Sequence, residues 1–286
     1  MTTSAGIPVV SSARVQVGAA TSRGPSRPLN ADAHAHHAYR DTFAAAVVDG
    51  TGSTPEVVDF AHVAASVAAR VAARGTPVLG VVAASAPYAD HDDDDSPEPN
   101  GAIVVASVRS GGYWRIAHAG DSSAYGLKDD GTLRRFTTPH TLGEEMRGQG
   151  ATDAEAAAHD HKLRHNLGRV PLYGVEGFEA VARLLVLASD GLKLPHEEFR
   201  GLLLDHGDDP QRCAEELVAA ARAHGSRDDV TALVIPHPDR PATAHGTDER
   251  NNHVERRPEE PAGPAEPAAG REPDADPAQG AVEVVA

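Results

Sequence analysis

Apolar residues fall in short runs along most of the chain, and polar turn residues separate these runs. Most of the runs are rich in Val and Ile and too short for a helix, which is typical of buried β-strands. The Asp130-Gly131 pair between two runs is a strong signal for a hairpin turn, so the sheet is at least partly antiparallel. The predicted strands are residues 13–20, 42–49, 101–108, 113–120, 122–127, 132–136, 183–190 and 229–236.

A longer segment, residues 55–74, has the pattern of an amphipathic helix. Apolar side chains recur there at every third or fourth residue and therefore fall on one face. Ser53 or Thr54 can cap the first turn, and Pro55 suits the first helical position. Shorter helices are predicted from Thr152, after Pro195 and over residues 210–224.

The composition changes near the C-terminal end of the last predicted strand. Pro, Ala, Glu, Asp, Arg and Gly dominate from there, and such a segment cannot bury enough surface to offset its ordering entropy. We therefore expect a flexible N-terminus at residues 1–12, one folded domain at 13–236 and a disordered tail at 237–286. Within the domain, residues 88–100 are rich in Asp and are expected to form a solvated loop, with weak cation binding as the alternative.

Charge and cysteine content narrow the range of partners. The 42 acidic residues exceed the 26 basic ones and give a net charge of −16, so we expect no nucleic acid partner. The sequence shows neither a signal peptide nor an apolar run of about 20 residues, so we expect a cytoplasmic protein without a membrane span. The single cysteine, Cys213, excludes an intrachain disulfide and a four-thiolate zinc site, and it is expected to be an inert thiol.

Four aspartates lie at the ends of predicted strands. Asp49, Asp121 and Asp190 follow apolar runs, and Asp228 comes just before one. An Asp-Gly pair after a strand can simply form a turn. Four such residues at the edge of a core instead favour a shared site, because clustered carboxylates need a cation or many hydrogen-bond donors.

Five short segments carry a further signal through their order and spacing. In chain order they are Gly24-Pro-Ser-Arg27-Pro-Leu-Asn30-Ala31-Asp32, AAAVVDGTGS around Asp49, Gly120-Asp121-Ser122-Ser123-Ala124-Tyr125, Ser189-Asp190-Gly191 and Asp228-Asp229-Val230-Thr231. Over residues 14–235 they resemble the motifs of the PPM-type, or 2C family, metal-dependent serine/threonine protein phosphatases of bacterial type. The resemblance implies an α+β fold, a two-layer antiparallel β-sandwich flanked by helices, with four layers in the order α/β/β/α.

The resemblance also implies a role for each matching residue. Asp49 would bridge two Mn2+ or Mg2+ ions, Asp121 with Asp190 would take a third, weaker ion, and Arg27 would hold the substrate phosphate through its planar fork of donors. The implied catalytic residues are thus Arg27 and Asp49, and the implied metal ligands are Asp32, Asp49, Gly50, Asp121, Asp190 and Asp228.

Hydrolysis of phosphoserine and phosphothreonine on proteins is the leading functional hypothesis. Two close metal ions lower the pKa of a shared water and stabilise an in-line displacement, so no covalent enzyme intermediate is needed. The expected partners are phosphorylated protein substrates, and the protein is expected to act as a monomer. Two alternatives stay open: a phosphatase-like regulatory or binding module with little turnover, and an enzyme for some other phosphoester.

Several positions depart from the family pattern. Ala31 stands where the family usually has Glu or Gln, which predicts weaker binding of the second ion. Thr51 stands where some relatives have a proton-donating histidine, which predicts slower phosphoserine hydrolysis. Ser123 and Pro139 also depart from the pattern and are expected to be peripheral. The histidines after Asp32 are expected to face solvent, although a transition-metal site is an alternative; they are His34, His36 and His37.

Overall fold

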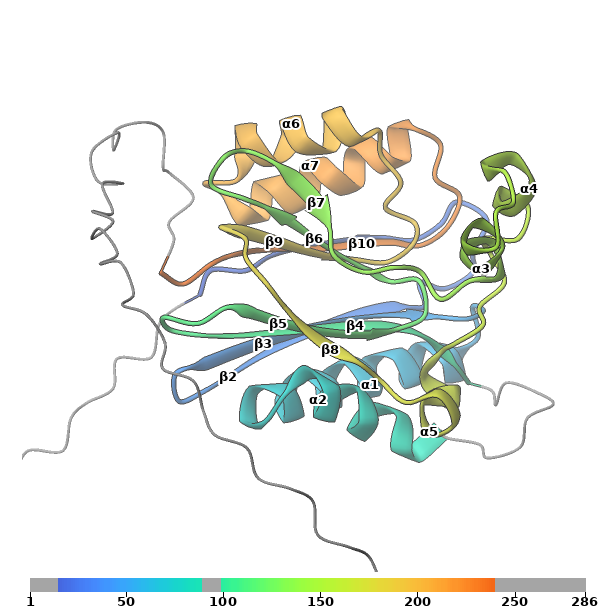
Figure 1. Cartoon of the computed structure of the whole chain (residues 1–286), viewed down its shortest axis with the longest axis horizontal. Coiled ribbons are helices and arrows are strands. Elements are labelled where there is room, and N and C mark those ends of the chain that lie inside the picture. The colour runs from blue at the N-terminus through green and yellow to red at the C-terminus, as the bar shows by residue number, and fades with distance from the viewer. Residues whose placement is uncertain (1–14, 89–98, 240–286) are drawn as a thin grey trace, which may run out of the picture. The chain divides into compact units, whose positions relative to one another are not determined.

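The computed structural model of the chain describes residues 15–88 and 99–239. Its centre is a pair of five-stranded antiparallel sheets that stack face to face, and a pair of helices covers the outer face of each sheet (Figure 1). This arrangement confirms the expected α+β fold with four layers. Two predictions concern residues outside this description: the flexible N-terminus at residues 1–12, and nearly all of the disordered tail at residues 237–286.

The first sheet has the strand order β1-β10-β9-β6-β7. Its strands are β1 (Gly18–Ser22), β6 (Ser123–Leu127), β7 (Leu133–Arg135), β9 (Leu184–Ala188) and β10 (Val230–Pro236). The helices α6 (His196–His206) and α7 (Pro210–Ala223) cover it (Figure 1). The predicted hairpin is confirmed, since β6 and β7 pair antiparallel and Gly131 has a φ of +77° in the connecting turn.

The second sheet has the strand order β2-β3-β4-β5-β8. Its strands are β2 (Asp32–Tyr39), β3 (Thr42–Gly50), β4 (Gly101–Arg109), β5 (Trp114–Ala119) and β8 (Gly177–Ala180). The helices α1 (Pro55–Arg74) and α2 (Pro77–Ser85) cover its outer face. Thr54 caps α1 as predicted, because its side chain accepts a hydrogen bond from the Val57 N–H.

Three small helices lie at the ends of the sandwich. They are α3 (Leu142–Gly148), α4 (Asp153–Ala157) and α5 (Val170–Tyr173). The helices α3 and α4 project together from one end of the two sheets (Figure 1). Thr152 caps α4 at the position predicted for a helix start. In the described part of the chain, no helix combines the length and apolar character that crossing a membrane requires.

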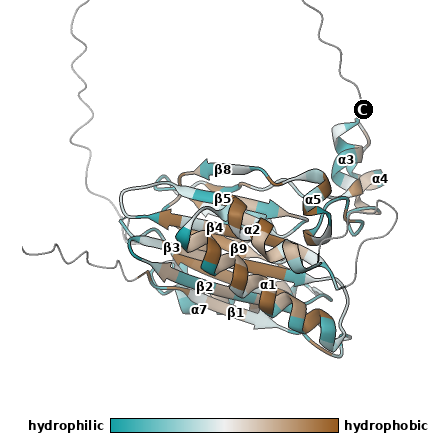
Figure 2. Ribbon diagram, turned by 90° about the horizontal axis from the view of Figure 1, so that it is seen from below, coloured by the Kyte–Doolittle hydropathy of each residue, from teal (hydrophilic) through white to brown (hydrophobic). Residues whose placement is uncertain are grey.

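The core has three layers of buried side chains. One lies between the sheets, and the other two lie between each sheet and its helices. Residues on both faces of β3 and β4 are buried, which explains why their sequences are continuous apolar runs instead of alternating ones. Small residues on α1, such as Ala64 and Ala68, let the helix approach the sheet closely. Figure 2 shows hydrophobic residues along α1, α2 and the strands behind them.

The C-terminal end of the described chain is held by contacts with the β4–β5 turn. His237 is buried, and its ring hydrogen-bonds the Gly112 carbonyl at 3.0 Å. Asp239 accepts a hydrogen bond of 2.5 Å from the Gly111 N–H. The ordered contacts therefore continue up to Asp239, three residues beyond the predicted domain boundary at residue 236. Most of the Asp-rich insert, residues 89–98, lies outside the described chain.

Candidate active site

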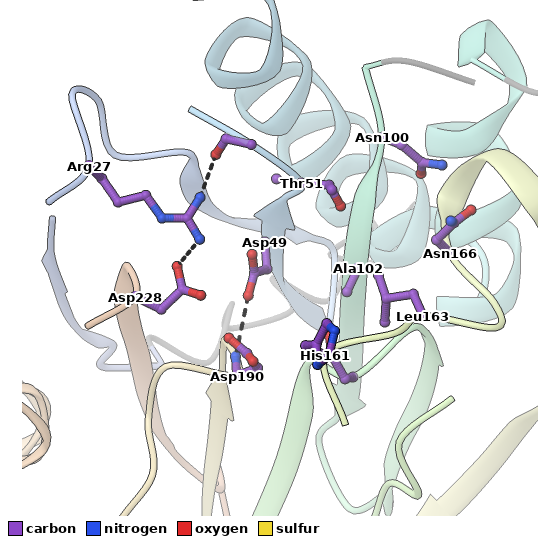
Figure 3. A pocket seen from close by; sticks show the side chains of 13 residues that line it. Arg27, Asp49, Thr51, Asn100, Ala102, His161, Leu163, Asn166, Asp190 and Asp228 are labelled. Atoms are coloured by element: carbon purple, nitrogen blue, oxygen red, sulfur yellow. Dashed lines mark hydrogen bonds and ion pairs between the residues drawn. The ribbon is translucent and has the colours of Figure 1, made fainter. Parts of the chain in front are cut away.

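A cavity of about 360 Å3 lies where several strand ends meet at one end of the sandwich (Figure 3). It brings together six of the residues singled out from the sequence: Arg27, Asp49, Gly50, Asp121, Asp190 and Asp228. These residues come from segments as distant along the chain as the loop before β2 and the loop before β10. The expected convergence of the aspartates is therefore present in the fold.

Strand pairing places the first two carboxylates next to each other. Asp49 is the next-to-last residue of β3, and it lies directly opposite Asp32 at the start of β2. The backbone N–H of Asp190, which follows β9 in the other sheet, donates a hydrogen bond of 3.4 Å to Oδ2 of Asp49 (Figure 3). A contact between the two sheets thus fixes Asp49 and Asp190 relative to each other.

The glycines of the two Asp-Gly pairs are required by close packing. A Cβ on Gly191 would lie 2.0 Å from the carbonyl oxygen of Asp229, and a Cβ on Gly50 would lie 2.8 Å from that of Ala31. Gly50 also donates its N–H to the Ala31 carbonyl at 3.1 Å. Any larger residue would push the strand ends apart, so these glycines keep the aspartates within reach of one another.

The carboxylates raise one another's pKa values. Burial raises the pKa of Asp49 well above its usual range, and the negative charges of Asp32, Asp190, Asp121 and Asp228 raise it further. Burial, together with the Asp190 charge, raises the pKa of Asp121 to about 7. Such a cluster holds protons near neutral pH unless a cation compensates its charge.

Asp32 lies behind Asp49 and does not line the cavity. Its side chain is buried, and Oδ2 accepts a hydrogen bond of 2.7 Å from the Ser189 hydroxyl. The other oxygen, Oδ1, is buried without a hydrogen-bond partner. Burial raises the pKa of Asp32 to about 7, while the hydrogen bond from Ser189 lowers it. An unpartnered carboxylate oxygen beside Asp49 is available to a bound water or ion.

Arg27 extends over the cavity from the loop before β2. Its guanidinium donates to the Gly52 carbonyl at 2.8 Å and forms a short ion pair with Asp228 (Figure 3). A buried carboxylate, Asp229, anchors this loop at both ends. Its two oxygens accept hydrogen bonds from the N–H groups of Gly24 and Ala31, at 2.7 and 2.8 Å. The sequence motif included Asp229 but did not reveal this anchoring role.

The donor set matches the chemistry of hard divalent cations, which prefer carboxylate and carbonyl oxygens. Among the residues that the structure describes, however, no three His, Cys, Asp or Glu groups form a ready-made metal cage. Two of the expected ligands instead face protein cations: Asp228 pairs with Arg27, and Asp190 lies 3.3 Å from the Lys193 ammonium. These pairs engage Oδ1 of Asp228 and Oδ2 of Asp190, so a bound cation would compete with Arg27 and Lys193 for the same carboxylates.

Other residues of the cavity were not singled out from the sequence. Asn100, Asn166 and His161 line it together with Thr51. The Oδ1 of Asn100 accepts hydrogen bonds from Gly101 and Gly168, at 2.7 and 3.1 Å, and joins the start of β4 to a later loop. These positions depend on how the loop at residues 158–169 folds back, and no sequence pattern indicates that.

The histidines after Asp32 and the lone cysteine lie outside the cavity. His36 is exposed, as expected. The expectation of a solvent-facing side chain was wrong for His34 and His37, which are both half-buried on a strand that packs beside α1. Burial lowers the pKa of His34 and disfavours its charged form. Cys213 is buried, and burial raises the pKa of its thiol to about 12, which disfavours the reactive thiolate.

The known proteins to which this chain is similar are protein phosphatases. No family model matches the chain. "Probable protein phosphatase 2C 41" of Oryza sativa subsp. japonica is 29% identical over 150 residues, which are 46% of this chain and 53% of that protein. "Protein phosphatase 1F" of Mus musculus is 47% identical over 57 residues, which are 18% of this chain and 13% of that protein. The chain therefore spans about half the length, or less, of these curated relatives.

Solved structures show the same fold over most of the chain. The PPM Ser-Thr phosphatase MsPP from Mycobacterium smegmatis, in complex with cacodylate, is 24% identical with a TM-score of 0.63, over 77% of this chain and 97% of that one. The serine/threonine phosphatase Stp1 from Staphylococcus aureus is 17% identical with a TM-score of 0.68, over 82% of this chain and 99% of that one. The fold of this chain is that of the PPM phosphatases.

Proposed function

We propose that the chain is a metal-dependent phosphatase that hydrolyses phosphoserine and phosphothreonine on proteins. The observation that carries this proposal is the convergence of four strand-end aspartates and Arg27 on one cavity. Matching segments in curated protein phosphatases, together with the shared fold, support it. Bound at the carboxylates, two Mn2+ or Mg2+ ions would supply a water of lowered pKa and neutralise charge on the phosphate.

In this proposal, each residue at the cavity would have its own role in metal binding. Asp49 would bridge the two ions, and Asp190 with Asp228 would complete the shell of the first. The Gly50 carbonyl, and Asp32 through a water on its unpartnered oxygen, would hold the second. Asp121 with Asp190 would hold a third, weaker ion. Asp49 and Asp121 are buried among other carboxylates whose negative charges raise their pKa values, which favours cation binding at these two residues.

Arg27 has a second role once the ions are bound. If Asp228 held a cation, its pairing with Arg27 would weaken, and the guanidinium could then bind two oxygens of the substrate phosphate. The remaining hydrogen bond to the Gly52 carbonyl keeps it aimed over the cavity. His161 is the imidazole that lines the cavity, and it can donate a proton to the leaving oxygen in place of the histidine absent at Thr51.

The direct test compares two aspartate variants on a phosphothreonine peptide, with and without Mn2+. Asp190→Ala removes a cavity carboxylate and is expected to lower kcat/KM by about 100-fold or more, since metal ions supply several kcal/mol of transition-state stabilisation. Asp59→Ala removes an exposed carboxylate on α1 and should retain full activity. Phosphate release from the wild type that ignores Mn2+, or that Asp190→Ala leaves intact, would contradict the proposal.

A regulatory module with little turnover is the second candidate. It is favoured by the two cations, Arg27 and Lys193, that already face the expected ligands, and by the absence of a side-chain oxygen at Ala31. Negligible phosphate release from wild type and Asp190→Ala alike, from both peptide and small-molecule substrates, would support this candidate over the enzyme.

A further inference from the structure

Two further cavities lie beside the cavity at the aspartates, and the row of three is called the groove below. The second cavity, of about 290 Å3, shares Asp121 and Asp190 with the first. The third, of about 430 Å3, begins where the second ends. The residues that line both the second and the third are Tyr125, Arg135, Leu192 and Lys193. A row of neighbouring cavities therefore leads away from the proposed site of hydrolysis.

Some of the positively charged residues that line the groove are already paired with carboxylates, and others are not. Arg147 lines the second cavity, but its guanidinium is already paired with three carboxylates. Two parallel hydrogen bonds of 2.8 Å join it to Asp160, and it also forms ion pairs with Glu144 and Asp153. One arginine and three carboxylates give this network a net negative formal charge. The positive charges left to act on a ligand are those of Arg135 and Lys193, which both line the junction of the second and third cavities.

Arg135 is held in place by neutral partners. Its Nη2 donates a hydrogen bond of 2.6 Å to the Ser123 hydroxyl, and its guanidinium carbon lies 5.8 Å from the centre of the Tyr125 ring. Tyr125 and Arg135 are cross-strand partners in the β6–β7 hairpin, so rigid strands support the pair. A guanidinium fixed by a hydroxyl and a ring keeps donors and a full positive charge for an anionic ligand.

Lys193 is the second positively charged residue at the junction of the second and third cavities. Its ammonium lies 3.3 Å from Asp190, which belongs to the proposed metal site. When Asp190 binds a cation, this lysine loses its partner and is available to the groove. Beyond the two cations the lining becomes apolar, with Leu133, Leu194 and Phe199 in the third cavity. The groove thus passes from carboxylates to cations and then to hydrophobic side chains.

We propose that this groove binds the polypeptide flanking the phosphorylated residue, with Arg135 and Lys193 recognising an acidic side chain and the apolar end taking a hydrophobic one. The proposal rests on the proposed phosphatase function and names its substrate class: phosphoproteins with an acidic residue close to the phosphorylated one. A small phosphoester would fill only the first cavity, so the longer groove favours a peptide over a metabolite.

The test uses phosphothreonine peptides in which a single Glu, Gln or Lys occupies each of the three positions on either side of the phosphorylated residue. With wild-type protein and Mn2+, kcat/KM for the best Glu peptide should exceed that for its Gln counterpart by about three- to tenfold, as expected for charge pairing at a partly exposed site. Arg135→Met should bring this ratio close to one. Arg134→Met, which alters the neighbouring residue on β7 whose side chain points to the opposite face, should preserve it.

A charge reversal separates recognition from a general loss of structure. Arg135→Glu should favour the Lys peptide over the Glu peptide, and a folding defect cannot reverse a preference in this way. Equal kcat/KM for all peptides with the wild type, or an unchanged preference in Arg135→Glu, would overturn the proposal while the phosphatase function stood. Absence of Mn2+-dependent hydrolysis of any peptide would overturn the phosphatase function itself, and the groove proposal with it.

Discussion

At the scale of single residues, the site is defined by uncompensated negative charge. Asp49, Asp32 and Asp121 each have a raised pKa because they are buried, and neighbouring carboxylates raise each pKa further. Groups that favour a cation in this way hold protons when no cation is present. Protons and metal ions therefore compete for the same oxygens, which makes the stability of the protein depend on pH and on metal together.

Asp121 offers the clearest test of this competition. Its pKa is raised from 3.8 to about 7 in the folded state, so the stability it contributes is greatest below pH 4 and is lost as the pH rises toward 7. Asp121→Asn removes this loss. In the absence of divalent metal at pH 8, the variant should melt about 2–4 °C higher than the wild type, which corresponds to roughly 1 kcal/mol.

The same variant should respond differently to metal. Adding Mn2+ at pH 8 should raise the Tm of the wild type more than that of Asp121→Asn, because the variant has lost a ligand of the weaker ion and has less repulsion to relieve. At pH 5 the two proteins should have more similar Tm values. A metal-free Asp121→Asn protein that melts below the wild type at pH 8 would refute the electrostatic account of this residue.

At the scale of elements, the loop before β2 is positioned from the far end of the chain. Asp229 at the start of β10 accepts hydrogen bonds from Gly24 and Ala31, while Arg222 on α7 donates to the carbonyl oxygens of Ser22, Ser226 and Asp228. These contacts connect the N-terminal and C-terminal motifs about 200 residues apart. They hold Arg27 and Asp228 where the two side chains meet.

Asp229→Ala would leave two backbone N–H groups without their partner. We expect a loss of about 2 kcal/mol in the free energy of unfolding, because each unsatisfied buried donor costs about 1–3 kcal/mol and the freed loop relaxes in part. Activity on a phosphothreonine peptide should fall about tenfold, mainly through KM, since Arg27 loses its fixed position. Asp239→Ala, which removes a loop contact far from the cavity, is the matched control. A variant with wild-type KM would show that Asp229 does not position Arg27.

Most elements could be predicted from the sequence, and the exceptions have physical causes. The central strands were predicted because both of their faces are buried, so their apolar runs are continuous. The edge strands β2 and β8 were not, since polar or glycine residues interrupt their pattern. The helix α2 was also missed: its sequence, PVLGVVAAS, is apolar throughout and shows no helical period.

The residues of the candidate site that lie in sequence motifs could be predicted, and the others could not. The aspartates could be named because each ends or begins a buried strand, and strand ends meet at the edges of sheets. Asn100, His161, Arg135 and Lys193 could not, because loop folding and a hairpin register bring them to the groove. Ser123 was expected to be peripheral to the ions, and the sequence did not reveal that its hydroxyl accepts a hydrogen bond from Arg135.

At the scale of the whole molecule, the two stacked sheets support the candidate site at one end of the sandwich. Both sheets position carboxylates: Asp49 lies in β3 of one sheet, Asp190 and Asp228 lie next to β9 and β10 of the other, and Asp121 lies in the connection from β5 to β6. The helices α3 and α4 project from one end of the sandwich (Figure 1), and Glu144 and Arg147 of α3 line the second cavity. Because the ligands lie on both sheets, metal binding would join the two layers and stabilise the fold as a unit.

Anomalous diffraction from a crystal grown with Mn2+ tests the central claim most directly. We predict two Mn peaks about 3.5–4 Å apart in the cavity, bridged by Asp49, with Asp190 and Asp228 turned toward them and Arg27 released from Asp228. The second peak should be the weaker of the two because Ala31 supplies no oxygen. Crystals that diffract well, contain Mn2+ and show no peak beside Asp49 would contradict a metal-dependent phosphatase.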